Sequence, residues 1–106
     1  MAVKQIGPHE LNQRLQMGED IRLIDVREPF ERDIASIGGD LLPLGTIPQQ
    51  LASIPRHGTV VVYCRSGGRS EYAIEYLQSQ GYGNLINLEG GILAWADTVD
   101  QKMKKY

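Results

Sequence analysis

The sequence predicts an α/β fold in which helices cover both faces of a mainly parallel central sheet. Short runs of apolar, β-branched residues alternate with segments whose apolar residues have helical spacing, and this alternation is typical of parallel sheets. Hydrophobic residues make up 42% of the 106 positions, which is enough for the core of one domain. We therefore expect a single three-layer domain over residues 1–106.

Two expected strands, each followed by a helix, account for the start of the chain. Residues 3–6 form a short strand, and residues 8–17 form a helix that stops before Gly18. Residues 21–26 are apolar enough for a buried strand, and residues 30–37 can form a short helix before the next glycine pair.

The middle of the chain is expected to be extended and then helical. Residues 41–44 form an extended piece in which Pro43 favours a position at the edge of the sheet. Thr46 can cap a helix over residues 47–53.

The last part of the chain carries the strongest strand signal. Residues 59–63 are all β-branched or aromatic, so we expect a central strand there. A helix over residues 70–80, a strand over residues 84–88 and a last helix beginning at residues 92–96 follow. Residues 98–106 are expected to be a frayed tail.

Composition excludes several classes of function. A net charge of −2 provides no basic surface for nucleic acid. No apolar run reaches membrane length, and residues 1–7 lack the apolar core of a signal peptide. We therefore expect a cytoplasmic protein with no nucleic-acid or membrane partner.

Cysteine and histidine usage gives no metal or cofactor site. The single cysteine, Cys64, excludes an internal disulfide and a cysteine-cluster metal site. His9 and His57 stand beside Pro8 and Gly58, where surface or turn positions are expected. We expect no metal and no cofactor.

Cys64 follows the predicted central strand directly. Ligands of parallel α/β sheets collect at the carboxyl ends of the strands, so Cys64 lies at the expected position of a site. The alternative is a small buried hydrophobic residue, a common fate of free cysteine. That alternative explains a cysteine after residues 59–63, but not the arginines and glycines that come next.

The residues after Cys64 can hold an anion and activate a thiol. A thiolate is the reactive form of cysteine, and nearby cations or a helix N-terminus favour it. Arg65 and Arg69 supply positive charge, and a helix is expected to begin near by. Gly67 and Gly68 allow successive N–H groups to converge on one point. Such a loop suits a compact anion such as thiosulfate, phosphate or a persulfide.

Three segments resemble the rhodanese family of sulfurtransferase domains. Residues 64–70 (CRSGGRS) resemble the family's active-site loop. Residues 23–29 (LIDVREP) and 88–95 (LEGGILAW) resemble its early and late signatures. The three occur in the right order over almost the whole chain, which implies a single rhodanese-like α/β/α domain.

The resemblance also implies roles for individual residues. In the family, the cysteine takes up a sulfane sulfur as a persulfide and passes it to an acceptor, so Cys64 would be the nucleophile and sulfur carrier. Asp25 and Arg27 would lie behind the loop, where Asp25 either orients a loop arginine or forms a surface ion pair of little energetic value. The residues expected to bind the substrate, by backbone N–H groups or by arginine side chains, are Arg65, Ser66, Gly67, Gly68, Arg69 and Ser70.

Loop length discriminates among relatives. Phosphatases built on this fold use Cys-x5-Arg, whereas Cys64 and Arg69 are separated by four residues. The shorter loop resembles the sulfurtransferase version, so a phosphatase or arsenate reductase is disfavoured. A non-catalytic interaction module would typically lack the cysteine. A redox sensor would need a resolving thiol from outside the chain.

Residues 36–45 (SIGGDLLPLG) resemble one subgroup of the rhodanese family. They are similar to the rhodanese domain appended to adenylating enzymes that charge ubiquitin-like sulfur carriers in molybdopterin, thiamine or tRNA thiolation, although Ser36 stands where the family often has histidine. The resemblance implies a small sulfur donor such as thiosulfate, and a protein sulfur donor or carrier as a further partner. Because the chain has no second thiol, a persulfide on Cys64 must be discharged by an external acceptor.

Overall fold

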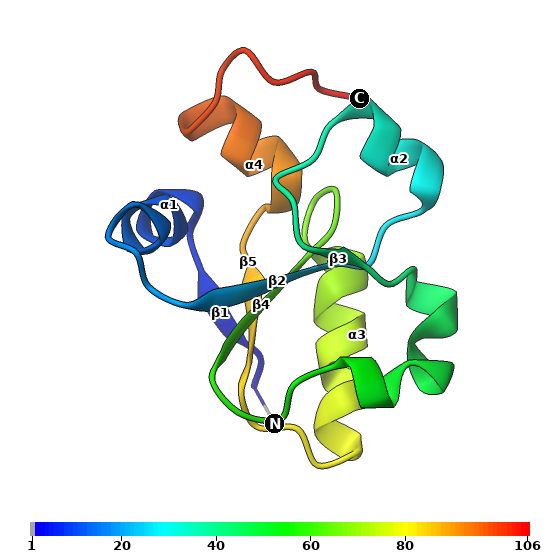
Figure 1. Ribbon diagram of the computed structural model, residues 1–106. Helices are drawn as coiled ribbons and strands as arrows, with labels where there is room; N and C mark the ends of the chain where they lie inside the picture. The colour runs from blue at the N-terminus through cyan, green and yellow to red at the C-terminus, as the bar shows by residue number, and fades with distance from the viewer. Residues whose placement is uncertain (1) are drawn as a thin grey trace.

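A five-stranded parallel sheet, in the order β1-β5-β4-β2-β3, forms the middle of the computed structural model, which describes residues 2–106. The expected mainly parallel α/β fold is confirmed (Figure 1). The strands are β1 (Lys4–Ile6), β2 (Ile21–Asp25), β3 (Asp40–Leu41), β4 (Thr59–Tyr63) and β5 (Leu85–Leu88).

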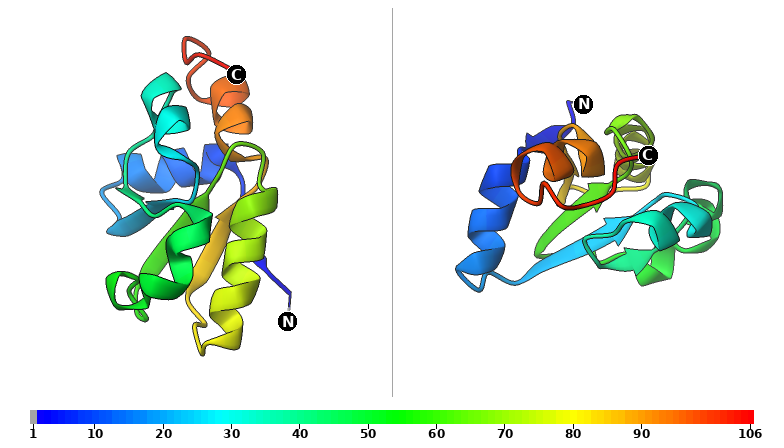
Figure 2. Two further views of the ribbon diagram at one scale, coloured as in Figure 1. Left: turned by 90° about the vertical axis from the view of Figure 1, so that its right-hand side faces the viewer. Right: turned by 90° about the horizontal axis from the view of Figure 1, so that it is seen from above.

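Helices cover both faces of the sheet, as expected of a three-layer domain. One face packs against α1 and α4, and the other against α3 and the 3-10 segments (Figure 2). No helix in residues 2–106 has the length and apolar composition needed to cross a bilayer. The helices are α1 (Pro8–Gln16), α2 (Pro29–Ile34), α3 (Gly68–Ser79) and α4 (Gly91–Thr98), with 3-10 segments η1 (Leu44–Gln49) and η2 (Leu51–Ser53).

Strand β4 directs the thiol of Cys64 toward α3. Successive side chains of a strand point to opposite faces of its sheet. Val60 and Val62 belong to the core that includes α3, whereas Val61 and Tyr63 belong to the core on the α1 and α4 face. Cys64 continues the alternation and lies in the α3 core, 1% exposed.

The middle of the chain differs from its expected helix. The prediction of one helix over residues 47–53 is wrong, because the structure has the two short 3-10 segments η1 and η2 there. The backbone leaves helical geometry at Gln50, with φ of −114° and ψ of 15°, which separates the two segments. Thr46 is not a side-chain cap: its hydroxyl donates to the carbonyl oxygen of Pro43 at 2.7 Å.

Helix α2 is shorter than the expected segment of residues 30–37. It ends at Ile34 because Ala35 adopts an extended conformation with φ of −161°. The carbonyl oxygen of Ala35 accepts a hydrogen bond from Arg27 Nη2 at 2.7 Å. Ser36 Oγ accepts the N–H of Gly38 at 2.9 Å, so this serine closes a turn.

The segment after α4 has no helix or strand, but it is not a frayed tail. Met103 and Tyr106 pack against the core that contains Trp95, and Trp95 is itself 8% exposed, as expected of a core residue. The segment, red in Figures 1 and 2, runs from α4 to the neighbourhood of α2. Hydrogen bonds of Tyr106, described below, hold its end in place.

Candidate active site

The Cys64 sulfur lies at the carboxyl end of β4, with two donors within hydrogen-bond reach. The backbone N–H of Gly67 donates to Sγ at 3.1 Å, and the Ser70 hydroxyl lies 3.4 Å from Sγ. Both donors come from the loop that follows Cys64, so the loop folds back over the sulfur. Neutral donors at these positions can stabilise negative charge that develops on sulfur.

Gly67 gives the loop its curvature. Its φ is +108°, a conformation that favours glycine, and it is the residue that precedes α3. Helix α3 begins at Gly68, two residues earlier than the segment expected from Ser70. The N-terminus of α3, with its unpaired N–H groups, therefore starts within the loop itself.

The start of α4 fixes the other side of the loop. The N–H groups of Ile92 and Leu93 donate to the carbonyl oxygens of Cys64 and Arg65 at 3.0 and 3.1 Å. Gly91 has a φ of +61°, and a Cβ atom there would lie 2.5 Å from the carbonyl oxygen of Arg65. The late Gly-Gly motif is therefore needed for close packing against the cysteine loop.

Asn87 supports the loop from β5 and was not among the expected site residues. Its Nδ2 donates to the carbonyl oxygen of Gly67 at 3.3 Å, and its Oδ1 accepts a hydrogen bond from Ser70. Asn87 is 2% exposed within a fully buried strand. A polar residue in an otherwise apolar strand is the sequence signal that could have identified it.

The Ser70 hydroxyl has three acceptors around one hydrogen. They are Cys64 Sγ, the carbonyl oxygen of Gly67 at 3.1 Å, and Asn87 Oδ1. Since a hydroxyl has a single O–H, it donates to one of them at a time. It can therefore turn toward sulfur when the sulfur carries negative charge.

Arg69 is held by Glu31, which was also not among the expected site residues. Arg69 Nη1 and Nη2 donate to the two carboxylate oxygens of Glu31, each at 2.7 Å. Glu31 is 4% exposed. The Arg69 hydrogen bonds outweigh burial and lower the pKa of Glu31 to about 2. Glu31 also accepts the N–H of Glu28 at 2.9 Å, and this capping box at the start of α2 was the available signal.

Asp25 and Arg27 form a buried pair. Arg27 Nε and Nη2 donate to the two carboxylate oxygens of Asp25, each at 2.9 Å, and both side chains are wholly buried. The expectation of a surface ion pair is therefore wrong, because neither group reaches solvent. The side chain of Asp25 pairs with Arg27 and lies near Arg32, at 3.8 Å, rather than orienting Arg65 or Arg69.

Tyr106 links this buried pair to the loop. Its hydroxyl accepts a hydrogen bond from Arg27 at 2.8 Å and donates to Glu31 at 3.1 Å. Although burial opposes the charge on Arg27, hydrogen bonds with Asp25 and Tyr106 raise its pKa. The chain of contacts from Asp25 through Arg27, Tyr106 and Glu31 ends at Arg69.

Arg65, the other loop arginine, is exposed and also contacts Tyr106. Its Nε donates to the main-chain oxygen of Tyr106 at 2.6 Å, and Nη2 donates to the same oxygen. Its guanidinium lies 5.2 Å from the centre of the Tyr106 ring. Ser66 and Gly68 are exposed.

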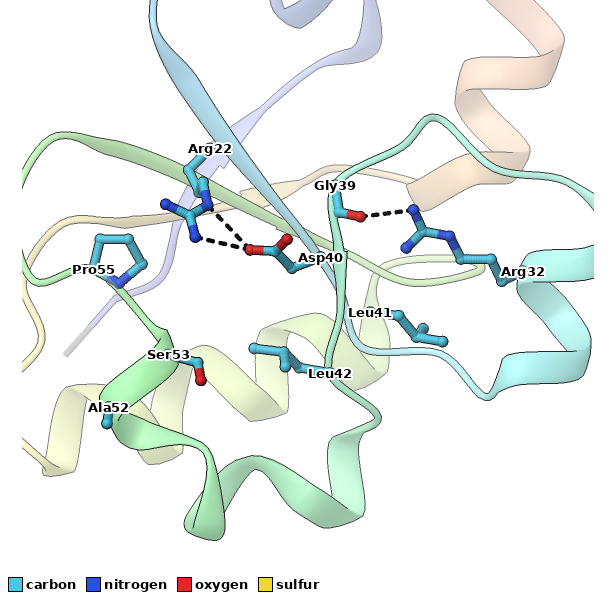
Figure 3. Close-up of a pocket in the computed structure, with 9 residues that line it drawn as sticks. All are labelled: Arg22, Arg32, Gly39, Asp40, Leu41, Leu42, Ala52, Ser53 and Pro55. Atoms are coloured by element: carbon cyan, nitrogen blue, oxygen red, sulfur yellow. Dashed lines mark hydrogen bonds and ion pairs between the residues drawn. The ribbon is translucent and has the colours of Figure 1, made fainter.

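One cavity lies on the flank of the cysteine loop, and another lies next to β3. A cavity of about 370 Å³ is lined by Ser66, Gly67 and Asn87 on the flank of the loop. A larger cavity of about 940 Å³ lies beside β3, where Arg22 pairs with Asp40 (Figure 3). No residue of the cysteine loop lines the larger cavity, so the two hollows are separate.

Neither of the two histidines is among the residues described for this site. His9 and His57 are both exposed, as expected of surface residues. Within residues 2–106, the acidic, histidine and cysteine side chains form no group of three that could hold a metal ion.

The fold and the site define a class of parallel α/β domain that carries a cysteine in a short arginine- and glycine-containing loop at the carboxyl edge of its sheet. The chain belongs to the rhodanese-like domain family, whose model matches residues 7–98. This confirms the family expected from the three sequence motifs.

Relatives and solved structures agree with this assignment. The chain is 47% identical to a protein of Allochromatium vinosum named "Sulfurtransferase", over 89% of both chains. It is 39% identical to the "Probable adenylyltransferase/sulfurtransferase MoeZ" of Mycobacterium tuberculosis, covering 95% of this chain but 26% of that protein. The crystal structure of a rhodanese-like domain protein from Staphylococcus aureus superposes with a TM-score of 0.83 at 30% identity, covering 98% of this chain and 99% of that one.

Proposed function

We propose that this domain transfers sulfane sulfur through a persulfide on Cys64. Membership of the rhodanese-like family and a relative named sulfurtransferase support sulfur transfer in general. The observation that carries the proposal is the Gly67 N–H hydrogen bond to Cys64 Sγ within a Cys-x4-Arg loop. It places a backbone donor on the sulfur that would react.

In the first half-reaction, thiosulfate is the sulfur donor. The Cys64 thiolate attacks the sulfane sulfur, and a bond forms between Sγ and that sulfur. The bond between the sulfane sulfur and the sulfonate sulfur breaks, and its electron pair leaves with sulfite. The negative charge then lies on the terminal sulfur of the Cys64 persulfide, where N–H groups of the loop can stabilise it.

In the second half-reaction, an acceptor removes the terminal sulfur. A thiolate or cyanide attacks that sulfur, the sulfur–sulfur bond breaks, and its electron pair returns to Cys64 as a thiolate. A protein persulfide can replace thiosulfate as donor by the same exchange, with the donor's thiolate as leaving group. The acceptor must come from outside, because Cys64 is the only cysteine.

Mass spectrometry tests this proposal. Thiosulfate treatment of the wild-type protein should add the mass of one sulfur atom at Cys64, and subsequent cyanide treatment should remove it as thiocyanate. Cys64→Ser should show no gain. If neither thiosulfate nor the persulfide of a cysteine desulfurase modifies the wild-type protein, sulfur transfer by Cys64 is excluded.

A second candidate function is service to a sulfur-carrier system. The similarity to a protein named adenylyltransferase/sulfurtransferase favours it, as does the expected likeness of residues 36–45 to such domains. In this proposal the terminal sulfur of the Cys64 persulfide attacks the activated carbonyl carbon of a carrier protein, and the activating group leaves with the electron pair of its bond to that carbon. An external thiolate then attacks Cys64 Sγ, the sulfur–sulfur bond breaks, and its electron pair leaves with the carrier thiocarboxylate. A second external thiol reduces the mixed disulfide left on Cys64. Co-purification of carrier and adenylating proteins with the wild type, but not with Cys64→Ser, would support it.

Phosphoryl chemistry is the less favoured alternative. The four-residue spacing between Cys64 and Arg69 gives a smaller loop than Cys-x5-Arg. We expect no turnover of an aryl phosphate under conditions in which thiosulfate loads Cys64. Rapid aryl phosphate hydrolysis that Cys64→Ser abolishes would reverse this order.

A further inference from the structure

Both arginines that flank the loop are engaged by other parts of the chain. The two outer nitrogens of Arg69 donate to the carboxylate of Glu31. Arg65 uses its Nε and Nη2 on the main-chain oxygen of Tyr106. An anion approaching the loop therefore meets guanidinium groups that already have acceptors.

The contact at Arg65 uses the edge of the guanidinium that suits oxyanions best. Nε and Nη2 form the planar fork with which arginine binds the two oxygens of a carboxylate, phosphate or similar group. Here the fork closes on the main-chain oxygen of Tyr106. The sulfonate group of a donor such as thiosulfate would compete for the same two N–H groups.

The Arg69 contact is more strongly fixed than the Arg65 contact. Glu31 is 4% exposed and is held by both Arg69 and the N–H of Glu28. Arg65 is exposed, and its partner oxygen belongs to an irregular segment after α4. Of the two arginines, Arg65 is therefore the one that an incoming anion can recruit.

The Tyr106 side chain holds its main-chain oxygen against Arg65. The hydroxyl is fixed between Arg27 and Glu31, at 2.8 and 3.1 Å. The ring lies 5.8 Å from the Arg27 guanidinium and 5.2 Å from that of Arg65. Substitution of the side chain removes these anchors while the main-chain oxygen stays in the sequence.

We propose that Tyr106 acts as an internal competitor for Arg65, an autoinhibitory contact that an anionic sulfur donor displaces when it binds the loop. Because it names the donor's anion site, this inference rests on the proposed sulfur transfer. Its physical basis is an equilibrium between two states, one with Arg65 bound to the Tyr106 oxygen and one with Arg65 free. Since only the free state binds the anion, the apparent affinity equals the intrinsic affinity multiplied by the fraction of molecules in that state. Tyr106 thereby sets the apparent affinity for small anionic donors.

An anion titration tests the inference without sulfur transfer. Inorganic sulfate is added to ¹⁵N-labelled protein, and the Arg65 Nε–H resonance is followed by NMR. We expect Tyr106→Ala to bind sulfate about tenfold more tightly than the wild type, because the side-chain anchors that hold the competing main-chain oxygen against Arg65 are lost. Tyr106→Phe, which removes the bonds to Arg27 and Glu31 but retains the ring, should show a smaller gain and serves as the better-folded variant.

Two controls separate competition from a general change in structure. Tyr72→Ala removes an exposed tyrosine of α3 and should leave sulfate affinity unchanged. In the Arg65→Ala variant, sulfate binding is followed by a backbone N–H resonance of the loop. Adding Tyr106→Ala to this variant should give no further gain in sulfate affinity. A gain of equal size without Arg65 would overturn the inference, as would equal sulfate affinity of the wild type and both Tyr106 variants.

The kinetic arm connects the contact to the proposed function. The concentration of thiosulfate that half-saturates loading of Cys64 should fall about tenfold in Tyr106→Ala. If sulfate binding tightens as expected but thiosulfate never loads Cys64, the Tyr106 competition stands and sulfur transfer from thiosulfate fails. If Cys64 is loaded while sulfate and thiosulfate affinities do not change, sulfur transfer stands and the competition fails.

Discussion

The two sides of the Cys64 site are built from different kinds of interaction. On one side, the N–H of Gly67 and the hydroxyl of Ser70 contact the sulfur, and Asn87 supports them. All three groups are neutral. On the other side, Arg69 and Glu31 belong to a charged network that continues to buried residues. Contact with the sulfur is made by the neutral side.

This division is consistent with the needs of a nucleophile. A thiolate paired directly with a cation is more abundant but less nucleophilic, because nucleophilicity falls with pKa. Neutral hydrogen-bond donors can stabilise negative charge first on Cys64 and then on a second sulfur, without forming a permanent ion pair with either. The charged side then fixes the loop from a distance, which predicts that its loss affects stability more than chemistry.

The largest expected effect on stability comes from removing the buried ion pair at the inner end of the charged network. Arg27→Ala leaves Asp25 buried without its partner, and such a change costs about 3–5 kcal/mol of a total stability of about 5–15 kcal/mol for a domain. Urea unfolding measures the loss. Arg27→Lys keeps the charge without the two-pronged geometry and should lie between the wild type and Arg27→Ala.

A surface pair provides the matched control for this experiment. Arg22 pairs with Asp40, and both side chains are more than half exposed. Arg22→Ala should cost less than about 1 kcal/mol. Equal losses for Arg22→Ala and Arg27→Ala would contradict the importance given to burial of the Asp25 pair.

The neutral side can be broken at Gly91. An alanine Cβ there would lie 2.5 Å from the carbonyl oxygen of Arg65, so the loop must move away from α4. A displacement of about 1 Å at a reacting group can cost about 100-fold in rate, and we expect a loss of that order in sulfur loading of Cys64. Gly45→Ala, where a Cβ meets open space, should load normally. Normal loading by Gly91→Ala would show that the α4 contact does not position the sulfur.

Glu31 offers a smaller test of the charged side, with a pH signature. The pKa of Glu31 is lowered to about 2 from an ordinary value of 4.5, so its stabilising effect is present above pH 4.5 and is lost as the pH falls toward about 2. Glu31→Gln should lower stability near neutral pH by about 2 kcal/mol. It should also flatten the fall in stability between pH 4.5 and 2, measured by urea unfolding. Glu75→Gln, at an exposed position on α3, is the control. If Glu31→Gln lost stability between pH 4.5 and 2 as steeply as the wild type, the low pKa given to Glu31 would be contradicted.

The same division explains which parts of the site could be predicted from the sequence. Cys64 and its loop are contiguous, so strand pattern, glycines and arginine spacing indicated them together. Glu31 and Asn87 reach the loop from α2 and β5, and a single sequence does not record which distant elements meet. Tyr106 was expected in a frayed tail, although its hydroxyl forms hydrogen bonds with Arg27 and Glu31. The helix expected over residues 47–53 was wrong because the backbone leaves helical geometry at Gln50, between the two 3-10 segments.

The smallest predicted effect concerns Ser70, whose hydroxyl lies within hydrogen-bond reach of the sulfur on the neutral side. Ser70→Ala removes an O–H group that is shared among three acceptors, so each acceptor loses only part of a hydrogen bond. We expect a cost of about 1 kcal/mol in stability and a decrease of about fivefold in the rate of sulfur loading. The exposed Ser79 of α3 provides the control, and Ser79→Ala should change neither quantity. A loss of loading with Ser70→Ala as large as that with Gly91→Ala would mean that the hydroxyl, rather than the backbone N–H of Gly67, is the main donor to the sulfur.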